Sequence, residues 1–354
     1  MKRLILIALA VIVLGGVGAA AWIYRSLEQP YRGFTEPEIF VEIPAGSSTT
    51  SMAHRLAEAG VVPNATAFEA AVWLRKAGRR LQAGEYRFDR PATPAEVVDR
   101  LARGDVYLRS ITFREGLTIR QMAQLFEEKG FGPADTFATA ASNPERIASL
   151  DPQARDLEGY LFPNTYALPR RATADTLVDR MVGAFEKTMS TELRERAAAR
   201  GLSVRQLVTL ASIVEKETGV AEERPLVAAV YSNRLKVGMG LQCDPTVIFA
   251  LQRVGRFDGN LSRDDLAFDS PYNTYKYPGL PPGPIAAPGK GSLEAAARPA
   301  EADYLYFVSR NDGTHAFART LDEHNRNVQK FQVQYFREKR MAERRRDQAG
   351  TSSR

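Results

Sequence analysis

The chain has 354 residues, of which 44% are hydrophobic and 25% are charged, proportions that are ordinary for a globular protein. This length predicts two or more domains with substantial cores. The single cysteine, Cys243, excludes an intramolecular disulfide and says little about the cellular compartment. Part of the net charge of +6 comes from residues 336–354, where seven basic and three acidic residues give a net +4. We interpret that segment as a solvated basic tail rather than a basic binding face.

The N-terminus begins with Lys2 and Arg3, and the 21 residues that follow, Leu4–Tyr24, include no charged residue. As a helix, this stretch would extend about 30 Å, which is enough to cross the hydrocarbon core of a bilayer. The leading cations favour a cytoplasmic N-terminus, although Arg25 weakens that bias. A cleaved signal peptide is the alternative, because Ala19-Ala20-Ala21 resembles a cleavage site. The apolar run is long for a signal peptide, so residues 1–24 predict an uncleaved inner-membrane anchor, with the rest of the chain exported.

After a polar, proline-containing linker at residues 25–39, two stretches of similar pattern follow, 44–60 and 114–130. Each comes after a short strand pattern and combines a glycine turn with an amphipathic helix that a glycine ends. Between them, the patterns predict a helix over 68–77 and a strand over 84–88. We therefore expect residues 40–150 to form a small α+β module with a connecting segment. The module resembles LysM domains, which bind polymers containing N-acetylglucosamine, and a purely structural spacer is the alternative.

The stretch Leu207–Gly219 has apolar residues at helical spacing and predicts an amphipathic helix with Ser203 as its N-cap. The helix ends in two carboxylates, Glu215 and Glu217, and at about 100° per residue both fall inside the apolar arc. A carboxyl group against apolar neighbours loses hydration, which raises its pKa and lets it donate a proton near neutral pH. The pattern leaves open that both acids point into water, and it does not distinguish one acid from the other.

Two further regions have an unusual composition. Residues 157–166 combine an acid, three aromatic residues, Gly and Pro, and such a segment can line a sugar cleft or form a buried aromatic turn. Residues 241–285 are rich in Pro, Gly and aromatic residues, which predicts fixed loops rather than disorder. Residues 304–319 then predict a hairpin around Asn311-Asp312-Gly313, followed by a last helix that continues to Tyr335.

The chain resembles the endolytic murein transglycosylases, the membrane-anchored lytic enzymes of bacterial cell-wall synthesis. The resemblance covers about residues 40–335. Its motifs are residues 211–218, 233–235, 241–242, 244–246, 272–275 and 279–285, and His315, Phe317, His324 and Asn325 also fit. It implies an α+β fold in the order transmembrane helix, small LysM-like α+β module and larger α+β catalytic domain at 151–335. The tail at 336–354 lies outside it. The family's catalytic acid matches Glu215.

The resemblance implies cleavage of the β-1,4 bond between N-acetylmuramic acid and N-acetylglucosamine within glycan strands, with nascent strands as the substrate during cell-wall elongation. The 6-hydroxyl of the muramic acid attacks its own C1 and leaves a 1,6-anhydro end, so one carboxyl group, Glu215, serves as acid and then as base. No metal or cofactor is required. The implied partners are the glycan strands, the inner membrane and peptidoglycan synthases. The candidate substrate-binding residues are Glu217, Gln242, Asp244, Tyr272, Asn273, Thr274, Tyr275, Tyr160 and Asn164.

Two other classes of function stay open at this point. A peptidoglycan hydrolase would use Glu215 with Asp244 or Glu217 as base, and it would leave a reducing end. A non-catalytic scaffold would bind glycan without cutting it. A nucleic-acid-binding role is disfavoured, because the predicted topology is exported and the sequence has no basic–aromatic face. His315 and His324 lie near acids, but their spacing fits no familiar metal site, and we expect them to pack or hydrogen-bond instead.

Overall fold

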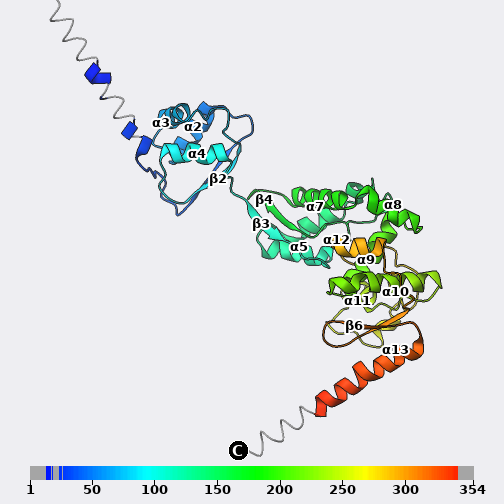
Figure 1. The fold of residues 1–354 in the computed structure, drawn as a ribbon. Coiled ribbons are helices and arrows are strands. Elements are labelled where there is room, and N and C mark those ends of the chain that lie inside the picture. The colour runs from blue at the N-terminus through cyan, green and yellow to red at the C-terminus, as the bar shows by residue number, and fades with distance from the viewer. Residues whose placement is uncertain (1–12, 17, 19–23, 26, 342–354) are drawn as a thin grey trace, which may run out of the picture. The chain divides into compact units, whose positions relative to one another are not determined.

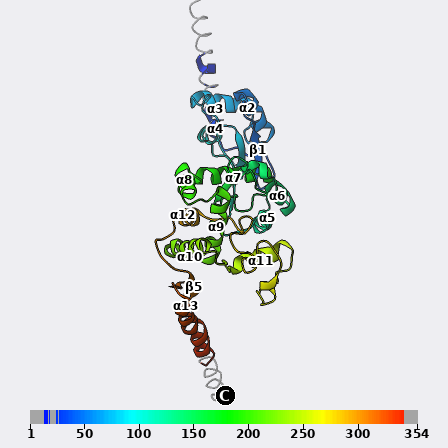
Figure 2. The same ribbon diagram turned by 90° about the vertical axis from the view of Figure 1, so that its right-hand side faces the viewer.

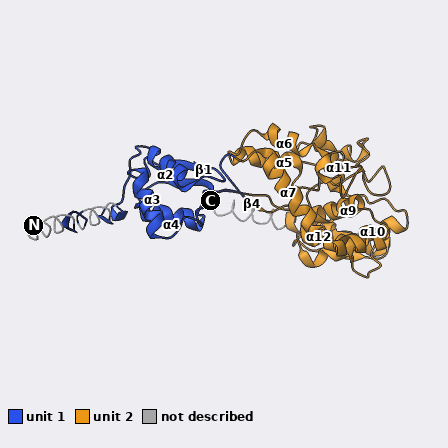
Figure 3. Ribbon diagram, turned by 90° about the horizontal axis from the view of Figure 1, so that it is seen from above, with its two compact units in different colours: residues 1–110, 167–171 blue, residues 111–166, 172–354 orange. Residues whose placement is uncertain are grey.

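The computed structural model describes residues 13–16, 18, 24–25 and 27–341, and the chain divides into two compact units (Figure 3). Unit 1 comprises residues 1–110 and 167–171, and unit 2 comprises residues 111–166 and 172–354. Helices predominate, and the described strands pair into three two-stranded sheets. This mixture confirms the predicted α+β class. The predicted module at 40–150 overlaps unit 1 up to residue 110 and unit 2 beyond it.

Unit 1 has the element order β-α-α-β-α. Its elements are β1 (Ile39–Ile43), α2 (Thr49–Glu58), α3 (Ala65–Leu74), β2 (Gly84–Phe88) and α4 (Pro94–Arg103). β1 and β2 are antiparallel, with Ile39 opposite Phe88. α4 begins at a capping box, in which Thr93 and Glu96 each accept a hydrogen bond from the other's backbone N–H. It ends at Gly104, whose φ of +70° is a conformation that glycine adopts without strain.

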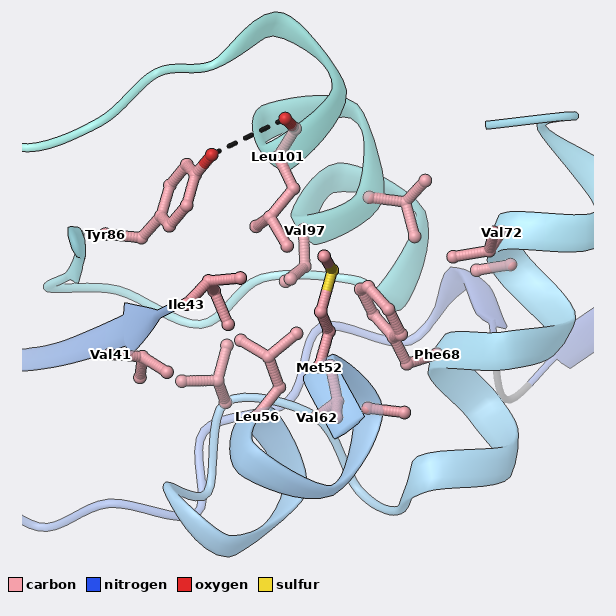
Figure 4. Close-up of a cluster of buried hydrophobic side chains, with 14 of the residues drawn as sticks. Val41, Ile43, Met52, Leu56, Val62, Phe68, Val72, Tyr86, Val97 and Leu101 are labelled. Carbon is pink, nitrogen blue, oxygen red and sulfur yellow. Dashed lines mark hydrogen bonds between the residues drawn. The ribbon is translucent and has the colours of Figure 1, made fainter. Parts of the chain in front are cut away.

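The core of unit 1 takes buried side chains from each of these elements, among them Ile43, Leu56, Phe68 and Leu101 (Figure 4). Burial of one such side chain contributes about 1.5–3 kcal/mol, so the cluster is the main source of the unit's stability. Leu27 and Phe34 also belong to this core, at 4% and 8% exposed, although they fall within the segment interpreted as a linker. The sequence pattern missed them because isolated apolar residues in a polar segment have no periodicity to detect.

A second sheet pairs β3 (Arg109–Thr112) with β4 (Thr165–Leu168), and the division between the units falls within it. Unit 2 is mainly helical. Its helices up to residue 253 are α5 (Ile119–Glu128), α6 (Ala134–Ala141), α7 (Ala174–Thr188), α8 (Thr191–Ala199), α9 (Val204–Glu217), α10 (Arg224–Lys236) and α11 (Asp244–Arg253), and α12 (Lys290–Ala297) follows a long loop region.

Helix α9 is the central element of unit 2 and contacts α8, α10, α11 and α12 (Figures 1 and 2). It begins at the predicted N-cap Ser203, which forms a capping box with Gln206. Every residue from Leu207 to Val214 is buried, including the polar Thr209 and Ser212. The middle of the helix is therefore enclosed on all sides rather than amphipathic, because four helices cover it. Both ends reach the surface, where Gln206 and Lys216 are exposed.

The C-terminal part of unit 2 holds the predicted hairpin, β5 (Tyr306–Ser309) and β6 (His315–Ala318), which are antiparallel. Helix α13 (Leu321–Val328) follows and continues as a π-helix over Gln329–Gln334. Over the residues that are described, no helix has both the length and the apolar character needed to span a bilayer. Most of the predicted anchor at 4–24 and the tail after residue 341 lie outside the described residues.

Candidate active site

Glu215 lies in the last turn of α9, and its side chain is 6% exposed. Its Oε2 accepts hydrogen bonds from the backbone N–H of Gly289, at 2.9 Å, and from the hydroxyl of Ser292, at 2.7 Å. Gly289 is the N-cap of α12, so the carboxylate meets the N-terminal end of that helix, where free N–H groups and the helix dipole stabilise negative charge. Both donors contact Oε2, which leaves Oε1 as the oxygen that can carry a transferable proton.

A cation and a second carboxyl group lie beside Glu215. Nη2 of Arg224, the first residue of α10, is 3.7 Å from Glu215 Oε1 and 3.4 Å from Oε2 of Glu115. Glu115 follows β3 in the chain, and its side chain is 47% exposed. Partial burial raises the pKa of Glu115, the charge of Glu215 raises it further, and Arg224 opposes both effects. The site is thus two carboxyl groups that share one guanidinium.

The surroundings of Glu215 differ from those that the sequence pattern predicted. The helical wheel placed the carboxyl group against apolar neighbours, whereas the structure surrounds it with an N–H, a hydroxyl and a guanidinium. The wheel describes only the helix that carries the residue. The donors come from α10 and from the N-terminus of α12, which only the tertiary fold brings to the end of α9.

Glu217 faces a different set of neighbours, two residues further along the chain. Its Oε1 accepts hydrogen bonds from the hydroxyl of Tyr231, at 2.6 Å, and from the thiol of Cys243, at 3.0 Å. Burial raises the pKa of the Glu217 carboxyl group, and these two hydrogen bonds only partly oppose the rise. Burial also raises the pKa of Cys243 well above its usual range, so its thiol is an unreactive packing group. Glu217 thus links the end of α9 to α10 and to the segment before α11.

The loop motifs contain two kinds of side chain. Asn273 and Thr274 are buried and shape the loops: Asn273 donates to the carbonyls of residues 266 and 268, and Thr274 Oγ1 accepts from the N–H of Cys243. Asp244 and Tyr275 are exposed, and they form a 2.5 Å hydrogen bond with each other. The structure therefore assigns the buried pair to loop shape and leaves the exposed pair open to a ligand.

Gln242, Asn164 and Tyr160 are distributed over three places. Gln242 is exposed at the surface with a φ of +49°, and its N–H donates to the carbonyl of residue 274. Asn164 is exposed in the turn before β4, where its side chain accepts from the next N–H. Tyr160 is 1% exposed and donates to Asp151 at 2.6 Å, and Asp151 also pairs with Arg205. Tyr160 is therefore part of a buried polar network.

Tyr272 and Tyr160 line one small cavity of about 60 Å³, together with Glu158 and Arg253. This volume suits one or two water molecules rather than a sugar ring. Tyr272 packs on Phe249 with ring centroids 5.0 Å apart. Glu158 accepts hydrogen bonds from the N–H of residue 119, and burial raises its pKa to about 8. The aromatic segment therefore forms a packed turn around buried acids, the alternative that the sequence left open.

The two C-terminal histidines make local contacts. His315 Nδ1 lies 2.7 Å from Glu223 Oε2, and the His315 N–H donates to the same carboxylate, whose pKa these contacts lower. The ring of His324 stacks on Tyr306 with centroids 5.2 Å apart. Within the described ranges, no cluster of three or more His, Cys, Asp or Glu side chains could hold a metal ion. These contacts agree with the expected packing and hydrogen bonding.

Four residues of the Glu215 site were absent from the sequence-based candidates, namely Glu115, Arg224, Gly289 and Ser292. Glu115 lies in a loop, Arg224 begins α10, Gly289 is the N-cap of α12, and Ser292 lies in the first turn of α12. These places have no common spacing from Glu215 in the sequence. One weak signal is present in the sequence, since Glu115 directly precedes Gly116, a glycine near the start of the predicted stretch 114–130.

An acid held by hydrogen-bond donors next to a second carboxyl group is an arrangement that general acid–base enzymes use. The chain belongs to the YceG-like family, whose match extends over residues 41–330. This finding, with the relatives described next, confirms the resemblance inferred from the motifs.

Two curated relatives are named endolytic murein transglycosylase. The one from Bacillus subtilis (strain 168) is 32% identical, over 89% of this chain and 91% of its own length. The one from Streptococcus pneumoniae serotype 2 (strain D39) is 31% identical, over 91% of this chain and 63% of its own length. The chain thus spans somewhat less than two thirds of the pneumococcal protein. A crystal structure of a YceG-like protein from Listeria monocytogenes is 33% identical, covers 82% of this chain and 99% of its own, and superposes with a TM-score of 0.56.

Proposed function

We propose that this protein is an endolytic lytic transglycosylase of peptidoglycan, a carbon–oxygen lyase. Relatives of that name match most of the chain, and the residue that matches the family's acid is held by two hydrogen-bond donors, which supports the proposal. The observation that carries the proposal is the Glu215 carboxyl group, which is almost fully buried and holds Oε2 against Ser292 and Gly289. Oε1 is then oriented for proton transfer, and the fixed orientation avoids an entropic cost in the transition state.

The chemistry needs one carboxyl group in two states. Protonated Glu215 gives its proton to the bridging oxygen as the bond between that oxygen and C1 of the muramic acid breaks. The resulting carboxylate takes the proton from the 6-hydroxyl as its oxygen bonds to C1, which closes the 1,6-anhydro ring. The proton returns to Glu215, no water is consumed, and atoms and charge balance. The donors on Oε2 stabilise the carboxylate between the two transfers.

The candidate binding residues support the proposal to different degrees. Asp244, Tyr275 and Gln242 are exposed in unit 2 and carry groups that can hydrogen-bond to sugar hydroxyl and amide groups. We assign substrate contact to these three. Asn273, Thr274 and Glu217 act indirectly in this proposal, because their polar atoms already hold loops and helices of the same domain.

Unit 1 is proposed to bind glycan strands, as a LysM-like module would. Its support is the element order β-α-α-β and an exposed aromatic residue, Trp73, which is 78% exposed at the end of α3. Trp73 lines a shallow hollow with Glu69 and Val72, and aromatic faces stack on sugar rings.

Trp73→Ala should weaken retention on insoluble peptidoglycan without changing the melting temperature. Val254→Ala, which also truncates an exposed apolar side chain, is the control. Equal retention of both variants would contradict a glycan-binding role for this face.

The proposed location is the bacterial inner membrane, with a single N-terminal span, a cytoplasmic N-terminus and the catalytic unit in the periplasm. The basis is the uncharged stretch Leu4–Tyr24 behind Lys2 and Arg3. Action on nascent strands beside peptidoglycan synthases is part of the same proposal. N-terminal sequencing of the mature protein tests the anchor, and a mature chain that begins near Trp22 would overturn it.

One experiment separates the proposed reaction from its rivals. Purified peptidoglycan is digested with the full chain, and the products are identified by mass spectrometry. We expect internal cleavage with 1,6-anhydro ends from the wild type and none from Glu215→Gln. Reducing ends would instead indicate a hydrolase, and binding without cleavage by the wild type would indicate a scaffold.

A further inference from the structure

The loop after β3 places Glu115 against the end of α9. Gly116 has a φ of +76°, and a Cβ added there would lie 3.7 Å from Cγ of Glu215. Two backbone hydrogen bonds tie the loop to the segment before α12: Gly116 donates to Ala287 at 2.8 Å, and Ala287 donates to Leu117 at 2.9 Å. Nζ of Lys216 donates to the Gly116 carbonyl at 3.2 Å. The loop is thus fixed from two sides, and the position of Glu115 is set by the fold.

Glycine at position 289 is what allows Glu115 to come so close. A Cβ at Gly289 would overlap the carboxyl group of Glu115, and the N–H of the same glycine donates to Glu215. One residue therefore contacts both acids, through its open α-carbon and through its backbone. Any side chain at this position would displace Glu115 from the site.

Arg224 is the cation that the two acids share, and a single nitrogen faces both. Nη2 approaches Glu215 Oε1, the oxygen that can carry the transferable proton, and it also approaches Glu115 Oε2. Of the other charged groups nearby, Lys216 is bound to the Gly116 carbonyl and Lys290 pairs with Glu294 at 3.6 Å. One positive charge cannot neutralise two carboxylates, so ionisation of one acid opposes ionisation of the other.

We propose that Glu115 is a positioning residue for the proton of Glu215: by binding Nη2 of Arg224, it holds the guanidinium back from Oε1, the oxygen that can carry the proton. This inference rests on the proposed function, in which Glu215 must start as the acid. Without Glu115, the guanidinium would serve Glu215 alone and would stabilise its carboxylate.

The consequence is a change in the pH dependence of the reaction. Loss of a negative neighbour lowers the pH at which an acid gives up its proton. In Glu115→Gln, the alkaline limb of kcat/KM should therefore move to lower pH, and the shift should be modest because solvent screens half-exposed charges. On that limb the rate should fall about tenfold, whereas on the acid side it should stay within about threefold of the wild type.

The test measures initial rates of anhydro-muropeptide release from purified peptidoglycan between pH 4.5 and 9, with the full chain in detergent. Glu128→Gln, which removes an exposed acid at the end of α5, is the matched control and should keep the wild-type profile. Glu115→Asp keeps the charge but shortens the side chain, so its limb should lie between those of the wild type and Glu115→Gln. If Glu115→Gln does not fold, the pH profile of Glu115→Asp serves as the readout instead.

Three outcomes decide between the claims. A shift of the alkaline limb in Glu115→Gln, with an intermediate limb in Glu115→Asp, supports the inference. An unmoved limb, or an equal loss at every pH, would reduce Glu115 to a structural role. If Glu215→Gln itself stayed active, the proposed function would fail. If Glu215→Gln were inactive but the alkaline limb of Glu115→Gln did not move, only the role of Glu115 would be overturned.

Discussion

Glu215 and Glu217 lie two residues apart on one helix, yet they have opposite surroundings. Glu215 faces a backbone N–H, a hydroxyl and a guanidinium that a second carboxyl group shares. Glu217 faces two uncharged donors, the phenol of Tyr231 and the thiol of Cys243. The first environment supplies donors to the carboxylate that forms when the acid gives up its proton. The second holds a carboxyl group whose pKa burial raises.

The difference shows that the tertiary contacts, rather than the position on the helix, decide what each acid can do. The two residues are about 200° apart around the helix axis, so each faces different elements. Glu215 meets the starts of α10 and α12, where charge and free N–H groups gather. Glu217 meets the side of α10 and the segment before α11, where neutral side chains pack.

The largest effect is expected for Glu215→Gln. The amide keeps the size of the side chain but has no proton to transfer, so the rate should fall roughly 10²- to 10⁴-fold or more. The fold should survive, because Gln can accept the same hydrogen bonds from Gly289 and Ser292. Release of anhydro-muropeptides measures the rate, and thermal melting checks the fold. A well-folded variant with near wild-type activity would exclude Glu215 from the mechanism and make Glu217 the first candidate.

A smaller loss is expected for Ser292→Ala, which removes one of the two donors to Oε2. A hydrogen bond to a charged group contributes about 1.5–3 kcal/mol, which corresponds to roughly a ten- to hundredfold fall in kcat/KM. Ser149→Ala, a matched change at an exposed serine on the surface of unit 2, should leave kcat/KM unchanged. If both serine variants behaved alike, the hydrogen bond to Glu215 would have no catalytic role.

Glu217→Gln should reduce activity by less than about fivefold, because an amide can accept the same hydrogen bonds from Tyr231 and Cys243. Steady-state kinetics beside Glu215→Gln measure this directly. A loss as large as that of Glu215→Gln would break the contrast between the two acids. It would also restore Glu217 as the base of a hydrolase.

The smallest catalytic effect is expected at Glu158, a buried carboxyl group outside both environments. Burial raises its pKa to about 8, so in the folded state it binds a proton that the unfolded state releases above about pH 4.5. Stability from this group is therefore complete at low pH and is lost as the pH rises toward 8, at up to about 1.4 kcal/mol per pH unit. Glu158→Gln should lose less stability than the wild type between pH 5 and 8 in denaturant titrations, with unchanged kcat. Parallel stability profiles would contradict the raised pKa.

Local signals were sufficient to predict many elements of the fold. Ser203 and the turn at Asn311-Asp312-Gly313 predicted a helix start and a hairpin that the structure confirms. Each is a short-range interaction within a few residues, so the sequence contains all of its parts. The family motifs likewise pointed to Glu215 and to membership of the YceG-like family, because they are contiguous in the chain.

What the tertiary structure alone decided is which groups meet Glu215. Glu115 lies 100 residues before it and Ser292 lies 77 residues after it, so no periodicity could connect them. The same holds for the enclosure of the middle of α9, which depends on four other helices, and for Leu27, whose burial depends on the core of unit 1. Caps and turns depend on neighbours in the chain, whereas an active site depends on distant segments that packing brings within hydrogen-bonding distance.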